Sequence, residues 1–159
     1  MRVFKDQTGR EWTVTVNVWE AKRAGDLLGV NILQLASGDP PLLVRLYTDF
    51  IFIVDVLWAF CKPQADAKGI TEQQFAEAMM GDGLANAHGA LMEELTDFFR
   101  QNRRPEMVAM LTTQAKIAAE GMALAASQIE RIDARAALSK TLGELSTSLP
   151  GSSASIPVP

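Results

Sequence analysis

Cysteine and histidine are almost missing from this sequence, with one of each among 159 residues. A single cysteine, Cys61, cannot form a disulfide within the chain, and it fits a reducing compartment. The single histidine, His88, has no cysteine near it, whereas a zinc site normally needs three or four ligands of these types. We therefore expect no metal and no cofactor, an inert Cys61 that packs in a helix, and a His88 that is exposed or hydrogen-bonded.

An excess of positive charge is also missing, because the formal net charge is −4. Proteins that bind nucleic acid neutralise phosphates with clustered lysine and arginine side chains. The nearest approach to such a cluster is Arg100, Arg103 and Arg104, which we interpret as a solvated helix junction. The sequence therefore predicts no nucleic-acid partner.

No apolar run is long enough to cross a membrane. The most apolar segment, Phe50–Phe60, has eleven residues with Asp55 at its centre, whereas a spanning helix needs about 20 apolar residues. We interpret it as a core helix, with Asp55 on an exposed stripe or paired at a helix terminus. Lys62-Pro63 predicts the end of this helix, because a residue before proline disfavours the helical region. The first residues do not resemble a signal peptide.

Motifs with catalytic chemistry are missing as well. Glu93, Glu94 and Asp97 lie beside an apolar helix face, which is typical of a solvated stripe. The segment 81–83 reads Gly-Asp-Gly but lacks the Lys-Ser/Thr that completes a phosphate-binding loop. The tryptophans at 12, 19 and 58 are expected in the core and not on a stacking surface. We therefore predict a protein that is not an enzyme.

The chain does contain enough apolar residues for a core, at 48% hydrophobic and 21% charged. A β-hairpin is indicated at the N-terminus, where Trp12–Val18 alternates apolar and polar residues and Thr8-Gly9 supplies a turn. Helical signals dominate the rest, so the predicted fold class is mainly α with a small N-terminal β-hairpin (α+β). The expected helices are one from Trp19 that stops at Gly29, one after an Asp39 cap, Phe50–Cys61, one after a Thr71 capping box, and Gly83–Gln101 after an Asp82 cap.

A long helix is predicted from Pro105 to Ser146. Seven of its residues follow the 3-4 spacing of a heptad seam: Ala115, Ala118, Met122, Ala125, Ile129, Ile132 and Ala136. A helix of about 40 residues must pack on something, so it folds back over its own domain or projects to meet another chain. The sequence leaves both alternatives open. The candidate partner-binding residues are Met107, Leu111, Met122, Ile129 and Ile132.

The predicted organisation has three parts. Residues 1–101 form the hairpin and a compact helical domain, and residues 105–146 form the long helix. Residues 147–159 are rich in serine and proline and are expected to be disordered.

Three segments resemble a family of small phage and prophage proteins, the tail assembly chaperones encoded beside the tape-measure gene. These segments are Gly9-Arg10-Glu11-Trp12, the Val54–Cys61 helix followed by Lys62-Pro63-Gln64-Ala65-Asp66, and Glu93–Phe99. The resemblance covers about residues 1–100. The long helix and the tail are similar to the family in character more than in sequence.

The resemblance implies a non-enzymatic role in virion morphogenesis, in the cytoplasm of a bacterial host. A chaperone of this family binds the long, apolar, helical tape-measure protein, keeps it soluble and helps recruit tail tube subunits. The alternative is a structural tail or connector component that stays in the virion. We also expect a homo-oligomer and no membrane partner. Many family members are made in a second, frameshifted length, for which Leu149–Pro159 would be a sensible junction.

Overall fold

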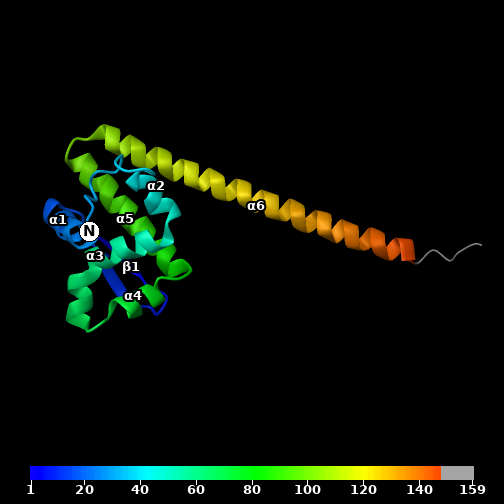
Figure 1. The fold of residues 1–159 in the computed structure, drawn as a ribbon, viewed down its shortest axis with the longest axis horizontal. Coiled ribbons are helices and arrows are strands. Elements are labelled where there is room, and N and C mark those ends of the chain that lie inside the picture. Colours follow the sequence, from blue (N-terminus) through cyan, green and yellow to red (C-terminus); the bar gives the residue numbers. More distant parts are fainter. Residues whose placement is uncertain (148–159) are drawn as a thin grey trace, which may run out of the picture. The chain divides into compact units, whose positions relative to one another are not determined.

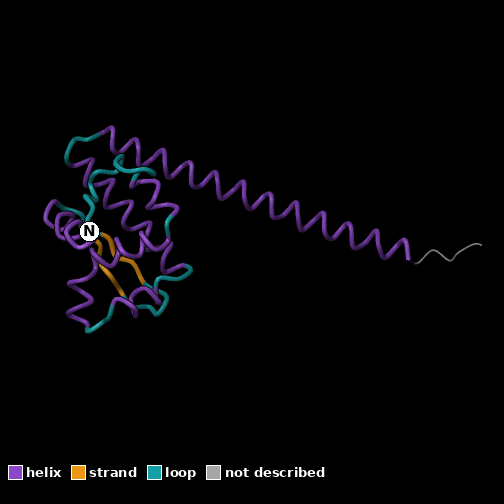
Figure 2. The backbone as a smooth tube through the Cα atoms, viewed as in Figure 1, coloured by secondary structure: helices purple, strands orange, loops and turns teal. Residues whose placement is uncertain are grey.

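The structure of this chain is a computed structural model that describes residues 1–147 (Figure 1). The predicted fold class is confirmed, because a small antiparallel hairpin precedes a chain that is mostly helical (Figure 2). Its elements are β1 (Arg2–Lys5), β2 (Glu11–Val14), α1 (Val18–Leu28), α2 (Leu42–Thr48), α3 (Phe50–Lys68), α4 (Glu72–Ala78), α5 (Asp82–Gln101) and α6 (Pro105–Thr147). The predicted disordered tail lies outside the described residues, apart from residue 147.

The hairpin is shorter than its alternating pattern predicted. Trp12 and Val14 are buried as expected, but β2 ends at Val14 and the chain enters α1 at Val18. The reason is a helix cap, since the Asn17 side chain accepts a hydrogen bond from the backbone N–H of Glu20 at 2.9 Å. Val18 is consequently exposed instead of lying on the inner face of a strand.

A buried carboxylate organises the turn between β1 and β2. Asp6 accepts hydrogen bonds from the backbone N–H and hydroxyl of Thr8 at 2.9 and 2.6 Å. It also accepts from the backbone N–H and Nε of Arg10 at 3.1 and 3.0 Å, and from the indole N–H of Trp12 at 2.9 Å. Because a buried charge is tolerated only when it is paired and hydrogen-bonded, these five donors make Asp6 the centre of the hairpin.

Helix α3 is the central element of the compact unit and packs against α1, α2, α4, α5 and β2. Its core-facing side chains include Phe52, Val56, Leu57, Phe60 and Cys61, all buried. Asp55 is half-buried, so it is neither part of the core nor on a fully exposed stripe. The apolar segment is thus a core helix. Within residues 1–147, no helix combines the length and apolar character needed to cross a bilayer.

The predicted end of this helix at Lys62-Pro63 was wrong. Pro63 has no N–H, so the carbonyl of Ala59 one turn earlier loses its usual donor. Arg23 of α1 replaces that donor and gives hydrogen bonds to the carbonyls of Ala59 and Phe60 at 2.7 and 3.1 Å. With this carbonyl satisfied, α3 continues through Pro63 and ends where Gly69 adopts a left-handed φ of 65°.

The next turn of α3 holds the hairpin in place. The Gln64 amide accepts from the backbone N–H of Thr13 at 2.9 Å and donates to the Thr13 carbonyl at 2.6 Å. Lys68 donates to the carbonyl of Glu11 and places its ammonium 4.4 Å from the centre of the Trp12 ring. The edge of β2 is therefore paired with side chains of α3 instead of a third strand.

The predicted helix starts had mixed outcomes. The capping box at Thr71 is confirmed, and α6 begins at Pro105 as expected. The predicted cap at Asp39 was wrong, because Pro41 has an extended conformation and α2 begins after it. Asp82 is the first residue of α5, so Gly81 and not Asp82 occupies the cap position.

Packing divides the chain into two units, with the boundary inside α6. The first unit is Met1–Lys116, and the second begins at Ile117. The sequence analysis placed the boundary at residue 101, at the junction between α5 and α6, whereas the packing places it after Lys116. The first turns of α6 join the compact unit because Leu111 is buried in its core and Met107 and Met110 pack against that core.

Candidate partner-binding surface

Three of the acidic residues of α5 form ion pairs with the first two residues of the chain. Arg2 forms ion pairs with Glu93 at 3.1 Å and with Asp97 at 2.8 Å. The hydrogen bond and charge of Arg2 hold the pKa of Asp97 below its usual range. Glu94 is buried and pairs with the amino-terminal ammonium group. These contacts fix β1 on α5 and give Glu93, Glu94 and Asp97 structural partners.

The prediction that His88 is exposed or hydrogen-bonded holds through its second alternative, since His88 forms a hydrogen bond with the Leu46 backbone. It is half-buried on α5, where its ring packs edge-on against Tyr47 with 4.6 Å between ring centres. Burial lowers the pKa of His88, although a hydrogen bond with the Leu46 backbone opposes this. Its Nε2 has no hydrogen-bond partner among the described residues. Within residues 1–147 no group of three or more His, Cys, Asp or Glu side chains is placed to hold a metal.

Cys61 is expected to be unreactive in the folded protein. Its side chain is buried in α3, and burial raises the pKa of the thiol to about 12. Because the thiolate is the nucleophile, native protein at neutral pH should not react with a thiol reagent such as dithiobis-nitrobenzoate, whereas urea-unfolded protein should react with one equivalent. Rapid reaction of the native protein would contradict this burial.

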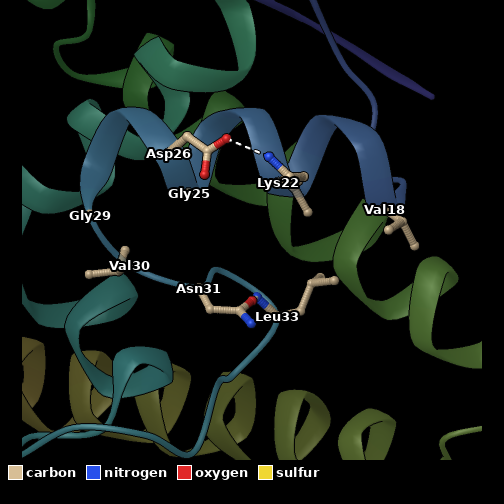
Figure 3. A pocket seen from close by; sticks show the side chains of 9 residues that line it. Val18, Lys22, Gly25, Asp26, Gly29, Val30, Asn31 and Leu33 are labelled. Carbon is tan, nitrogen blue, oxygen red and sulfur yellow. Dashed lines mark hydrogen bonds and ion pairs between the residues drawn. The ribbon is translucent and has the colours of Figure 1, made fainter.

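An open groove lies between α1 and the segment that follows it (Figure 3). Lys22 and Asp26 form a 2.8 Å ion pair with each other in its wall, and Asn31 is the other polar side chain in its lining. A Cβ at Gly25 would lie 2.6 Å from the Val30 carbonyl, so glycine is needed for this close approach. The groove thus results from how the chain packs after α1.

The residues predicted to contact a partner fall into two groups. Leu111 is only 3% exposed, and Met107 packs partly buried against the same core. Met122, Ile129 and Ile132 are 69%, 58% and 66% exposed. Only these three are mostly exposed in the described structure, because Leu111 and Met107 pack against the compact unit itself.

The three accessible residues belong to one face of the second unit, which we call the α6 stripe. The stripe consists of Ala118, Met122, Ala125, Ile129, Ile132 and Ala136. These residues recur at alternating intervals of four and three, which keeps them on one side of a helix with 3.6 residues per turn. The stripe is therefore a narrow apolar strip with small residues between large ones.

A second apolar row on α6 was missed by the sequence analysis. Its residues are Ile117, Leu124, Leu138, Leu142 and Leu145, and all are exposed. Ile117 directly precedes the first stripe residue and lies about 100° around the helix from it, and the other members of the row lie further round. A spacing of seven joins 117 to 124 and 138 to 145, but Arg131 interrupts it between them, which conceals the pattern.

The compact unit also exposes large apolar side chains. Trp19 is 68% exposed, so its expected place in the core was wrong, while Trp12 is buried and Trp58 is half-buried. The Asn17 cap fixes where α1 begins and thereby turns Trp19 to the surface. Phe50 and Ile51, at the start of α3, are likewise exposed.

The structure thus defines an α+β protein that is mostly helical. The part of its long helix α6 that belongs to the second unit carries two exposed apolar rows. The chain matches no protein-family model, no curated protein and no solved structure. Function must therefore be inferred from the exposed surface of α6 and from the residues that carry the family resemblance.

Proposed function

We propose that this chain is a non-enzymatic phage tail assembly chaperone that binds the tape-measure protein through the α6 stripe. In this role it keeps that apolar helical protein soluble and helps recruit tail tube subunits in the cytoplasm of the bacterial host. One observation carries the proposal. Between residues 117 and 145, eight large apolar side chains are more than half exposed, three in the stripe and five in the second row.

The chemistry of the stripe suits an apolar helix as the partner. Contiguous exposed apolar surface on a protein marks an interaction site. Anchors spaced three and four residues apart are how an amphipathic helix presents itself to an apolar partner. Met122 adds an unbranched, polarizable side chain that adapts to different neighbours, which suits a client that offers many similar segments along its length.

Introducing charge into the stripe is expected to abolish tape-measure binding. The double variant Met122→Asp/Ile129→Asp would bury two unpaired carboxylates in the interface, which is strongly unfavourable. When each chain is co-expressed with the tape-measure protein, we expect at least a tenfold lower yield of soluble complex in a pull-down for this variant. The tape-measure protein expressed alone should be insoluble.

The matched control is Ala134→Asp, which adds the same charge to the opposite side of α6. This variant should co-purify with the tape-measure protein as the unchanged chain does, and circular dichroism should show equal helix content in all three proteins. Equal recovery with the double variant would refute binding through the stripe. Purified virions should lack the chain, and its presence there would favour a structural tail or connector component instead.

A further inference from the structure

We propose that in the free protein the α6 stripe is covered by the same stripe of a second copy, running antiparallel, with the pair centred between Glu130 and Arg131. The pairing does not depend on which client the stripe later binds. A client helix bound at the stripe would take the place of the second copy.

The positions of the large side chains define this register. Centring the pair there places Ile129 of each copy against Ile132 of the other. These two contacts are equivalent by symmetry and lie next to each other at the centre of the pair. On either side, Ala125 lies against Ala136, and Met122 meets Ser139 beyond them. Helices approach most closely where contact side chains are small, toward about 8 Å between axes. The pattern of small residues outside large ones therefore favours close packing along the pair.

The overlap also matches the exposed part of the helix. In this register residues 117–144 of one copy lie along the same residues of the other, a length of about 42 Å at 1.5 Å per residue. The stripe would thus be covered over its whole length within the second unit, whose stripe side chains contact little else in the described structure.

Charge decides the direction of the pair. Positions flanking a seam set the orientation of paired helices. In a parallel, in-register pair, Arg135 of each copy would flank Lys140 of the other, giving two repulsive contacts. In the antiparallel pair, Arg135 faces Gln128 and Lys140 lies near Ala119, so no like charges meet across the seam.

The size of the interface indicates a modest affinity. Three large side chains and several alanines from each copy would bury roughly 1,000 Å² in total, which is near the lower limit for a specific interface. We expect a dissociation constant on the order of micromolar. The reason is that the free energy gained from a small interface only slightly exceeds the entropy that the two chains lose when they associate. A pair of this affinity covers the stripe in the free protein, and a client helix that binds more tightly can displace the second copy.

Disulfide cross-linking of single-cysteine variants tests both the pairing and its direction. Cys61 is the only native cysteine and is buried, so it contributes no background. We expect Met122→Cys and Ser139→Cys to cross-link when mixed under mild oxidation, and neither to cross-link alone. The control Ala134→Cys, on the outer side of α6, should stay uncross-linked with every partner.

Other results would overturn the proposal. Cross-linking of Met122→Cys alone would indicate a parallel pair. No cross-link in the mixture, together with a single-chain mass for the unchanged protein at tens of micromolar in sedimentation, would exclude the pairing. Both readouts use this chain without the tape-measure protein, so they distinguish failure of the pairing from failure of the proposed function.

Discussion

Replacing Asp6 by alanine is expected to lower the free energy of unfolding by about 3–5 kcal/mol, the usual cost of removing one partner from a buried charged network. The Asp6 side chain is fully buried and accepts five hydrogen bonds from Thr8, Arg10 and Trp12. Without it, the indole N–H of Trp12 and two backbone N–H groups lose their acceptor inside the protein. Urea denaturation followed by circular dichroism measures the difference.

The matched control lies on the same hairpin. Lys5 and Glu11 form an exposed ion pair at 3.5 Å, so Glu11→Ala should cost less than about 1 kcal/mol. Equal destabilisation by the two substitutions would show that the buried Asp6 carboxylate contributes no more to stability than an exposed one does.

The effect of Asp6 should also depend on pH in a definite direction. Burial by itself would raise the pKa of Asp6, but hydrogen bonds from Thr8, Trp12 and the Arg10 backbone outweigh it and lower the pKa. A carboxyl group whose folded pKa is lowered stabilises the fold above its unfolded pKa, about 3.9. The stability difference between the unchanged protein and Asp6→Ala should therefore narrow as the pH falls below about 4. A difference that stays constant would argue against the ionised form as the source of the stabilisation.

Arg23→Ala is expected to destabilise the protein by about 2 kcal/mol, as for hydrogen bonds that involve a charged group. The loss should depend on Pro63, because Arg23 donates to the Ala59 carbonyl that Pro63 leaves without a backbone donor. In a Pro63→Ala background the residue at 63 supplies an N–H again. Arg23→Ala should then cost at least about 1 kcal/mol less, which a double-mutant cycle in urea measures.

Lys22→Ala is the control for this cycle, since Lys22 pairs with Asp26 at the surface of the same helix. It should change stability by less than about 1 kcal/mol in both backgrounds. Strict additivity of Arg23→Ala and Pro63→Ala would mean that Arg23 stabilises the protein in some way unrelated to the missing donor.

The residues that carry the family resemblance have structural roles in this fold. Arg10 and Trp12 donate to Asp6 in the hairpin turn, and Gln64 pairs with β2. The carboxylates of the third resembling segment hold Arg2 and the amino terminus on α5. Proteins that share these residues would attach the hairpin to α3 and α5 through the same contacts. The proposed partner binding depends instead on α6.

Signals that act within a few residues were readable from the sequence alone. The capping box at Thr71, the helix start at Pro105, the left-handed turn at Gly29 and the burial of Trp12 and Val14 all follow from local patterns. A cap or a proline acts on backbone groups one turn away, so the sequence around it contains both partners. Most of the fold class is determined in this way.

The tertiary structure decided whatever depends on groups far apart in the chain. Helix α3 passes Pro63 because Arg23 reaches the freed carbonyl from a different helix, and no local pattern contains that pair. Leu111 and Met122 follow the same apolar pattern on one helix, yet Leu111 is buried and Met122 is exposed. Periodicity states which side of a helix is apolar, but burial also requires another element beside it, and only the folded chain determines where that element lies.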